Sequence, residues 1–347
     1  MKFSKIQTIE KILIIRLSSM GDVLLSTMLP RILRKQYPSA RIDIAVARQF
    51  SEIFIFNPYI SNLFEYDKNA SLKENKENLL KIATGKYDLI IDLQRNFRSF
   101  HLRWGLGKHV RKIKKNRLNK LSLVYFKRAI KSIEPIPLVY LKAAGVIDDG
   151  MPLELWLPNE KQAVYVRKKT YSQETKQVIA LAPGAHHATK RWQPEKFAEL
   201  SEKIFSNYKY DIILLGGVAD KEICGRVKNI AQCPITDYSG ASSIIETAKL
   251  LDSATLLITN DTGVSHISAV RQIPVITIFG STTPDFGFSP FRVQSQIIEK
   301  QISCRPCTHI GRSSCPKKHF DCMNLITVDD VFIKVNEILS LLISASK

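Results

Sequence analysis

The chain has 347 residues, which is too long for one ordinary domain and long enough for two domains with a hydrophobic core each. Its residues are 45% hydrophobic and 24% charged, which is typical of a globular protein, and no stretch approaches the roughly 20 consecutive apolar residues that a membrane-spanning helix needs. The formal net charge of +19 predicts an anionic partner, and nucleic acids, anionic membrane surfaces and phosphorylated substrates all fit that description.

The N-terminal segment contains the first predicted strand. Its apolar run is about six residues long before Arg16 interrupts it, and no small-residue cleavage site follows, so we expect no secretory signal. We therefore expect a cytoplasmic protein.

Short aliphatic runs along the chain predict buried β-strands. Their apolarity is continuous rather than alternating, which indicates parallel strands covered on both faces by helices. The predicted strands are Lys11–Leu17, Ile42–Ala47, Tyr87–Asp92, Val178–Pro183, Asp211–Gly216, Thr255–Asn260 and Pro274–Gly280. The predicted helices include Asp22–Gln36, Pro194–Asn207, Ser242–Leu251, Val264–Val270 and Val328–Ile343. The fold class is therefore α/β.

The α/β pattern restarts in the middle of the chain. Residues 152–177 are polar and contain proline, and a new series of strands and helices begins at Val178. We predict two Rossmann-like domains, over residues 1–157 and 176–347, with a linker at about 158–175. Ligands of open α/β sheets bind beyond the carboxyl ends of the strands, so the turns there are the candidate sites.

The first candidate turn lies in residues 16–30, which read RLSSMGDVLLSTMLP. Gly21 and the neighbouring serines allow the backbone to approach a ligand closely. Asp22, where the strand gives way to a helix, suits two roles: a helix cap that contributes about 1 kcal/mol, or a base that accepts a proton from a substrate hydroxyl. The turn alone favours the cap. It lacks G-x-G-x-x-G, so a nicotinamide site is not indicated.

A basic tract follows the third predicted strand. Between Arg95 and Lys131 there are thirteen Lys or Arg residues and no Asp or Glu, interleaved with aromatic residues. One interpretation is a solvated helical face, and the other is a docking surface for an anionic partner. The absence of acidic residues over this length strengthens the second interpretation. The aromatic residues are Phe97, Phe100, Trp104, Tyr125 and Phe126.

A second candidate turn, LAPGAHHATKRWQPEKFAEL, spans residues 181–200. Lys190 and Arg191 lie between a predicted strand and a helix that Pro194 opens, where their charges suit phosphate oxygens. The alternative is a pair of exposed basic residues that flank a packed Trp192.

The third candidate turn follows the predicted strand that ends at Asn260. There Asp261, Thr262 and Gly263 begin a helix, and the free backbone N–H groups of a helix N-terminus form an anion site. The alternative is an ordinary N-capped helix.

Four of the six cysteines crowd into one C-terminal segment, Cys304-x2-Cys307-x7-Cys315-x6-Cys322. This spacing is compatible with a structural zinc site, although a second C-x2-C pair is missing. Reduced loop thiols are the alternative, and a cytosolic setting argues against disulfides.

Three of these segments together resemble glycosyltransferase family 9, the ADP-heptose:lipopolysaccharide heptosyltransferases. They are SSMGDVLLSTMLP, PGAHHATKRWQPEKF and NDTGVSHISAV, and they occur in the order expected for that family. The cysteine segment also resembles one found in many members. The resemblance covers nearly the whole chain. It implies a GT-B fold, with the acceptor mainly on the first domain and the nucleotide sugar mainly on the second, and inverting transfer without a catalytic metal or other cofactor.

The resemblance also implies roles for individual residues. Asp22 corresponds to the catalytic base. With that function, the basic tract gains a role as a surface that holds an acceptor with phosphates and acidic sugars at a membrane. The expected acceptor contacts are Ser19, Gly21, Arg95 and Arg98, and the expected donor contacts are Lys190, Glu222, Asp261, Thr262, Gly263 and His266. Asp220 is an alternative to Glu222. Ala185 and His186 replace threonines of some relatives, so hydroxyl contacts expected there are in doubt.

We therefore predict an inverting transfer of heptose from ADP-heptose to the inner core of lipopolysaccharide, at the inner face of the cytoplasmic membrane. The partners would be the nucleotide sugar and an anionic glycolipid, and not nucleic acid. One alternative is a related transferase with a different nucleotide sugar or glycan acceptor. A nucleic-acid-binding protein is a remote alternative, because it would explain the charge but not the three turns.

Overall fold

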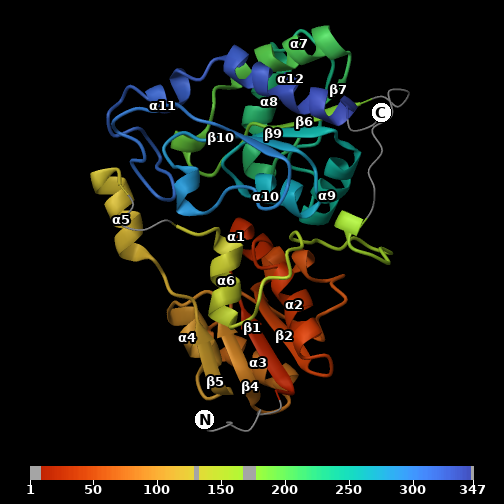
Figure 1. Cartoon of the computed structure of the whole chain (residues 1–347), viewed down its shortest axis with the longest axis vertical. Coiled ribbons are helices and arrows are strands. Elements are labelled where there is room, and N and C mark those ends of the chain that lie inside the picture. The colour runs from red at the N-terminus through yellow and green to blue at the C-terminus, as the bar shows by residue number, and fades with distance from the viewer. Residues whose placement is uncertain (1–8, 129–132, 167–176, 345–347) are drawn as a thin grey trace. The chain divides into compact units, whose positions relative to one another are not determined.

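The computed structural model describes residues 9–128, 133–166 and 177–344 of the chain (Figure 1). Their contacts divide the chain into two compact units. Unit 1 comprises residues 1–115 and 136–159, and unit 2 comprises residues 116–135 and 160–347. No helix in the described part of the chain is long and apolar enough to cross a membrane.

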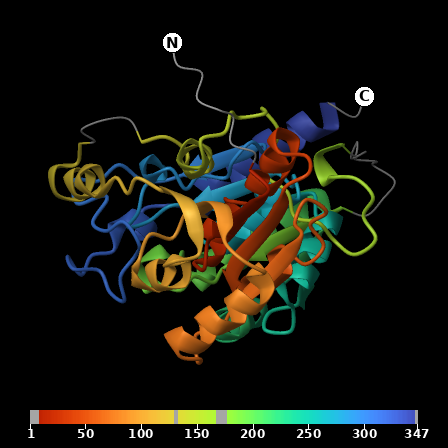
Figure 2. The same ribbon diagram turned by 90° about the horizontal axis from the view of Figure 1, so that it is seen from below.

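Unit 1 is built on a five-stranded parallel sheet in the order β3-β2-β1-β4-β5. Figures 1 and 2 show these strands side by side. The strands are β1 (Lys11–Ile15), β2 (Arg41–Ala47), β3 (Asn62–Tyr66), β4 (Tyr87–Asp92) and β5 (Gly107–Lys112). The helices are α1 (Met20–Leu24), α2 (Met28–Gln36), α3 (Leu72–Ala83), α4 (Phe97–Arg103) and α6 (Ile136–Ala144).

The core of unit 1 covers both faces of the central strands. Alternate residues of β1, Leu13 and Ile15, join Leu79 of α3 and Leu102 of α4 in one apolar cluster. The intervening residues Ile12 and Ile14 are equally buried, so β1 contacts no water on either face after Lys11. This two-sided burial explains why the sequence of β1 is continuously apolar.

Unit 2 is built on a six-stranded parallel sheet in the order β11-β10-β9-β6-β7-β8. The strands are β6 (Val178–Ala182), β7 (Asp211–Leu214), β8 (Ile235–Asp237), β9 (Leu256–Asn260), β10 (Val275–Ile278) and β11 (Ser295–Ile298). The helices are α5 (Arg117–Phe126), α7 (Pro194–Tyr208), α8 (Lys221–Ile230), α9 (Ile244–Ser253), α10 (Gly263–Val270), α11 (Asp321–Asn324) and α12 (Val328–Ser344).

Trp192 anchors the core of unit 2. Its ring is fully buried and meets Phe197 of α7 edge to face, with 5.0 Å between the ring centroids. Its Nε1 donates a hydrogen bond to the carbonyl of Ile326, 3.0 Å away, so the polar atom of this large side chain is satisfied. The packed-tryptophan interpretation of this turn is therefore correct for Trp192 itself.

Each sheet has one topological switch point, where the strand order reverses. In unit 1 it lies between β1 and β4, and in unit 2 between β6 and β9. The turns after these four strands contain Asp22, Gln94, Lys190 and Asp261. The fold therefore places the candidate residues where open α/β sheets bind ligands.

The predicted helix Asp22–Gln36 is wrong in one respect, because the structure divides it into α1 and α2. Between them the hydroxyls of Ser26 and Thr27 donate to the carbonyls of Val23 and Leu24, at 2.7 and 2.8 Å. These local bonds compete with the helical pattern and end α1 after five residues.

Candidate active site

Asp22 lies in the first turn of α1, at the switch point of unit 1. Its Oδ1 is 2.6 Å from a guanidinium nitrogen of Arg16 and accepts a hydrogen bond of 2.9 Å from the Tyr140 hydroxyl. Its Oδ2 accepts a hydrogen bond of 2.9 Å from the hydroxyl of Ser19, the N-cap residue of α1. The side chain stays 20% exposed. The backbone N–H of Ser19, 3.4 Å from Oδ2, is the fourth group in contact with the carboxylate. The carboxylate is therefore held by four groups and is still accessible to a small molecule.

These contacts set the protonation state of the carboxylate. Burial alone would raise the pKa of Asp22, but the Arg16 guanidinium and the hydrogen bonds from Ser19 and Tyr140 outweigh it, and the pKa lies below the usual aspartate value. Burial and the nearby Asp22 charge raise the pKa of Tyr140 well above its usual value. Near neutral pH Asp22 is therefore an anion and Tyr140 a neutral hydrogen-bond donor.

The turn that carries Asp22 is fixed from the neighbouring strand. The side-chain oxygen of Gln94, after β4, accepts hydrogen bonds from the backbone N–H groups of Leu17 and Ser18, at 3.0 and 3.1 Å. Arg16 also donates to the carbonyl of Leu93, at 2.6 Å. The turns after β1 and β4 are thereby joined into one polar edge.

The predicted acceptor residues all lie in unit 1. Ser19 and Gly21 flank Asp22 in its own turn, whereas Arg95 and Arg98 are exposed after β4. Arg95 has a left-handed backbone with φ of 46°, and its N–H donates to the buried Asp92 carboxylate at 2.7 Å. The structure therefore brings Ser19 and Asp22 into contact and leaves the side chain of Arg98 at the surface.

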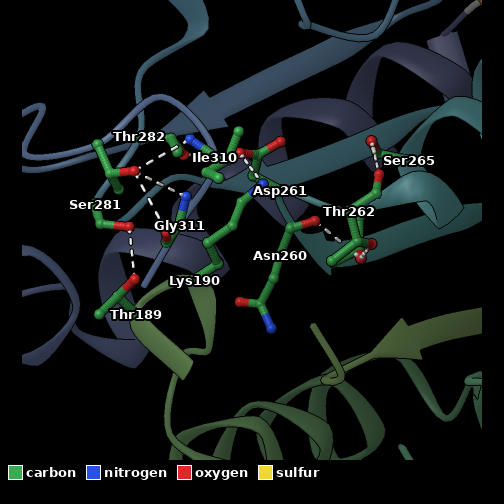
Figure 3. A network of polar contacts seen from close by, with 12 residues as sticks. Thr189, Lys190, Asn260, Asp261, Thr262, Ser265, Ser281, Thr282, Ile310 and Gly311 are labelled. Atoms are coloured by element: carbon green, nitrogen blue, oxygen red, sulfur yellow. Dashed lines mark hydrogen bonds and ion pairs between the residues drawn. The ribbon is translucent and has the colours of Figure 1, made fainter. Parts of the chain in front are cut away.

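Lys190 and Asp261 meet at the switch point of unit 2 (Figure 3). Lys190 Nζ is 2.6 Å from Asp261 Oδ2, and the Thr282 hydroxyl donates to the same oxygen at 2.7 Å. Each group comes from a different turn, after β6, β9 and β10 respectively. The predicted donor residues Lys190 and Asp261 are thus in direct contact.

Asn260 explains the position of these turns. This fully buried side chain donates to the carbonyl of Pro183 at 2.8 Å and accepts from the N–H of Trp192 at 3.0 Å. It therefore ties the end of β9 to both ends of the loop that carries Lys190.

The helix α10 begins directly after this cluster. Thr262 is its N-cap residue, and Gly263 is its first helical residue. The Ser265 hydroxyl bonds back to the Thr262 carbonyl at 2.7 Å, as Figure 3 shows. His266 is buried within the helix. As in other helices, the backbone N–H groups in the first turn of α10 can bind an anion.

The two candidate acidic residues near β7 differ in their environment. Asp220 Oδ2 accepts a hydrogen bond of 2.9 Å from the N–H of Gly217, and the Asp220 carboxyl packs directly against Gly184. A side chain on Gly184 would overlap it. Glu222 is exposed in the first turn of α8. The structure does not bring Glu222 into the Lys190–Asp261 cluster.

A model of glycosyltransferase family 9 (heptosyltransferase) matches residues 79–318. The chain belongs to this family. Lipopolysaccharide heptosyltransferase 3 of Escherichia coli is 27% identical over 279 residues, which cover 76% of this chain and 81% of that protein. This membership agrees with the resemblance seen in the three turn sequences.

Solved structures show the same fold. The family 9 glycosyltransferase of Veillonella parvula has a TM-score of 0.76 at 20% identity and covers 95% of this chain and 97% of its own. The E. coli ADP-heptose LPS heptosyltransferase II has a TM-score of 0.72 at 19% identity, with 97% and 100% covered. The predicted GT-B fold, with its parallel sheets, is confirmed.

The cysteine segment of this family 9 protein packs against the turn after β10. The buried Arg305 donates to the carbonyl of Thr282 at 2.7 Å and to the carboxylate of Glu299 at 2.7 Å. The N–H of Cys307 donates to the Ser281 carbonyl at 3.1 Å. The segment therefore supports the loop that contacts Asp261.

The four cysteines line one small cavity, together with His319. Within the described ranges, no group of three or more His, Cys, Asp or Glu side chains is arranged to hold a metal ion. All six cysteines are free thiols, and burial raises the pKa of Cys322 to about 12. The described residues therefore show no disulfide and no metal-binding arrangement at these cysteines. Of the two cysteines outside this segment, Cys224 is buried and Cys233 is half-buried.

Sequence reasoning missed several residues that shape the two sites. Arg16 follows β1 directly, so a search for charged residues at the ends of apolar runs would have found it. Tyr140 carried no such signal, because it lies 118 residues from Asp22 and belongs to no motif. Arg305 carried no such signal either, and it supports the Thr282 carbonyl from the cysteine segment. Thr282, by contrast, lies in the small-residue loop directly after the predicted strand Pro274–Gly280.

Proposed function

We propose that this family 9 glycosyltransferase moves a heptose from ADP-heptose to the inner core of lipopolysaccharide. The relatives named above carry this donor or this glycolipid in their descriptions. The observation that carries the proposal is the partly exposed Asp22 carboxylate, held by Arg16, Ser19 and Tyr140 at the switch point of unit 1. In this proposal the acceptor binds in unit 1 and the nucleotide sugar in unit 2.

Asp22 is the proposed general base. A sugar hydroxyl is a poor nucleophile near neutral pH, so a base must take its proton while the anomeric carbon gains oxocarbenium character. The lowered pKa keeps Asp22 ionised and ready to accept that proton. It also makes Asp22 a weak base, so proton transfer occurs late, when the attacking oxygen has already become acidic. A direct displacement of this kind inverts the anomeric centre.

Lys190 and α10 are the proposed site of the diphosphate. Negative charge develops on the ADP as it leaves, and a cation together with a helix N-terminus stabilises such charge. Asp261 holds the Lys190 ammonium in place. Thr262, Gly263 and His266 would contact the donor around the helix start, and Glu222 would contact its ribose. We propose that this protein-supplied charge removes the need for a metal ion in the transfer step.

The experiment is a transfer assay with ADP-heptose and an inner-core acceptor that lacks heptose. We expect one heptose to be added, with inversion seen by NMR, and no loss of rate in EDTA. A panel of ADP- and UDP-sugars in a thermal-shift assay tests the donor. If another nucleotide sugar gives the largest shift and supports transfer, the protein is a related transferase with a different donor.

A further inference from the structure

Helix α4 presents an unusual aromatic face. Phe97, Phe100 and Trp104 recur at helical spacing, and they are 70%, 39% and 62% exposed. The opposite side of the helix, with Ser99 and Leu102, is fully buried. Single exposed apolar side chains are common on protein surfaces, but three aromatic rings on one helical face form a patch that marks an interaction site. We call these three residues the α4 face.

Helix α5 repeats this arrangement in unit 2. Leu118, Leu121 and Tyr125 share one face, Phe126 follows, and the opposite side buries Asn119 and Leu123. Tyr125 and Phe126 are 73% and 77% exposed. Both helices are labelled in Figure 1. We call the exposed set the α5 face: Leu118, Leu121, Tyr125 and Phe126.

The α5 helix is fixed to its unit from the side away from this face. The Lys127 ammonium donates to the carbonyls of Cys304 and Pro306, at 3.1 and 2.8 Å. The Lys120 ammonium lies 5.1 Å from the centre of the Phe288 ring. These contacts involve Lys120 of α5 and its C-cap Lys127, and within the described residues the α5 face stays exposed.

The charge around both faces selects the chemistry of the partner. Both helices lie in the tract of thirteen basic and no acidic residues between Arg95 and Lys131. Exposed cations flank the apolar residues directly: Arg98, Lys114, Lys115, Arg117 and Arg128. Helices with aromatic and leucine side chains on one face and basic residues beside them bind at the boundary between lipid headgroups and acyl chains. Nucleic acid would satisfy the cations but would not bury leucines.

We propose that the α4 face of unit 1 and the α5 face of unit 2 are each a docking surface for an anionic lipid bilayer. The cations contact lipid phosphates, and the aromatic and leucine side chains enter the headgroup boundary. The proposal names the membrane contact of the proposed heptosyltransferase, and its functional consequence rests on that function.

The α4 face is closely connected to the Asp22 turn. Gln94, two residues before the N-cap of α4, holds Leu17 and Ser18 by hydrogen bonds. The Ser99 hydroxyl of α4 donates to the buried Asp92 carboxylate at the end of β4, at 3.0 Å. A bilayer contact at α4 therefore acts on the same edge of the sheet that carries the proposed base. A glycolipid acceptor would be presented to that edge.

Vesicle sedimentation tests the contact without any assay of activity. The probes are vesicles of phosphatidylethanolamine with phosphatidylglycerol and vesicles of pure phosphatidylcholine. We expect binding to the anionic vesicles that weakens with added salt, because salt screens the charges. The α4 variant Phe97→Ser with Trp104→Ser and the α5 variant Leu118→Ser with Tyr125→Ser should each lower the partition coefficient by about tenfold or more.

The matched control is Ile333→Ser with Leu341→Ser on α12. These side chains are exposed to a similar extent, but α12 carries Asp329, Asp330 and Glu337 instead of a basic cluster. Their replacement should leave vesicle binding unchanged. The proposal is overturned if all three variants lose vesicle binding equally, or if the α4 and α5 variants lose none. If only one of the two variants binds vesicles normally, the face that was changed in that variant takes no part in docking.

Trp104 supplies a direct probe, because the other two tryptophans, Trp156 and Trp192, are buried. Lipids brominated on their acyl chains should quench Trp104 fluorescence in the wild type and have little effect on Trp104→Phe. If Trp104 is not quenched while the protein still sediments, the α4 face does not enter the bilayer. If its fluorescence changes with protein concentration in the absence of lipid, a second copy of the chain covers the face instead.

Transfer kinetics separate this proposal from the proposed function. The α4 and α5 variants should raise KM for an acceptor embedded in vesicles by about tenfold and leave transfer to a deacylated, water-soluble acceptor unchanged. Loss of both activities in a folded variant would contradict the docking role, since the residues would then serve the site itself. Absence of transfer in the wild type would contradict the proposed function, and the sedimentation and quenching results would still decide the docking surface.

Discussion

Both units hold an ion pair at equivalent points of their sheets, but the more exposed member is the anion Asp22 in unit 1 and the cation Lys190 in unit 2. At the switch point of unit 1, donors converge on one carboxylate, Asp22. At the switch point of unit 2, the cation Lys190 stands beside a carboxylate, Asp261, that Thr282 also holds. The doubly wound topology supplies the polar edge in both cases, and the residues on its turns decide which charge it presents.

This difference matches the needs of a group transfer. An incoming hydroxyl has a proton to lose, so it requires an anion that is already ionised. A leaving diphosphate gains negative charge, so it requires a cation and N–H groups. If these assignments are correct, changes in unit 1 should reduce the rate of transfer, and changes in unit 2 should weaken donor binding.

Asp22→Asn should have the largest effect. Asparagine has the size of aspartate and keeps a side-chain oxygen but cannot accept the proton, so transfer should fall by roughly 10²–10⁴-fold while donor affinity stays unchanged. The structure adds a cost in stability, because Arg16 is nearly buried and loses its charged partner. We expect a lower melting temperature in calorimetry.

The double variant Arg16→Gln with Asp22→Asn is the control for that cost. It removes both charges, so it should recover part of the melting temperature and remain inactive. If Asp22→Asn transfers sugar at nearly the wild-type rate, Asp22 serves only in the capping box of α1.

Among substitutions in unit 2, Lys190→Ala should cause the largest loss of donor affinity. A hydrogen bond to a charged group contributes about 1.5–3 kcal/mol, so donor affinity should fall roughly 10- to 150-fold in calorimetric titration. Lys228→Ala, in the last turn of α8, is the matched control for the loss of one positive charge. Equal donor affinity in wild type and Lys190→Ala would place the diphosphate elsewhere.

The sequence predicted the strands at the centre of each sheet and missed those at the edges. β3 and β5 are the outer strands of one sheet, and β8 and β11 of the other. β5, with the sequence GKHVRK, is mostly exposed and carries three basic residues besides its histidine. A search for continuous apolar runs finds strands buried on both faces. It therefore fails for edge strands, whose polar residues face water.

The candidate sites show a similar limit. Asp22, Lys190 and Asp261 were predicted because each lies in a turn directly after an apolar strand. Tyr140 was not, since only the fold brings α6 to the Asp22 turn. Local sequence indicates which residues can act chemically, whereas the partners that set their pKa come from distant segments.

Tyr140→Phe also tests the assignment of Asp22 as the base, and it should have a smaller effect on the rate of transfer. It removes one hydrogen bond to Asp22, worth about 1 kcal/mol, so transfer should fall about fivefold. The Tyr140 hydrogen bond lowers the pKa of Asp22, and its loss raises that pKa. The acidic limb of the pH–rate profile should therefore move to higher pH. A lower rate with an unchanged profile would mean that Tyr140 acts only in packing.

The same pKa shift predicts how stability depends on pH. Because the pKa of Asp22 is lower in the folded protein than in the unfolded chain, the carboxylate stabilises the fold above the unfolded pKa, near 3.9. This contribution is lost as the pH falls through the folded value. Acid unfolding of Tyr140→Phe should begin at a higher pH than that of the wild type. Coincident acid-unfolding curves would contradict this expectation.

The smallest expected effect distinguishes Glu222 from Asp220 as the acidic contact of the donor. Glu222 is exposed, so its hydrogen bonds to a ribose compete with water and should contribute about 0.5–1.5 kcal/mol. Glu222→Gln should therefore weaken donor binding roughly 2- to 10-fold without a change in melting temperature. Asp220→Asn should do the reverse, because the Asp220 carboxylate accepts from Gly217 and packs on Gly184. If calorimetric titration instead shows weaker donor binding for Asp220→Asn alone, Asp220 is the ribose contact, and the turn after β7 approaches the donor through this half-buried carboxylate rather than through the start of α8.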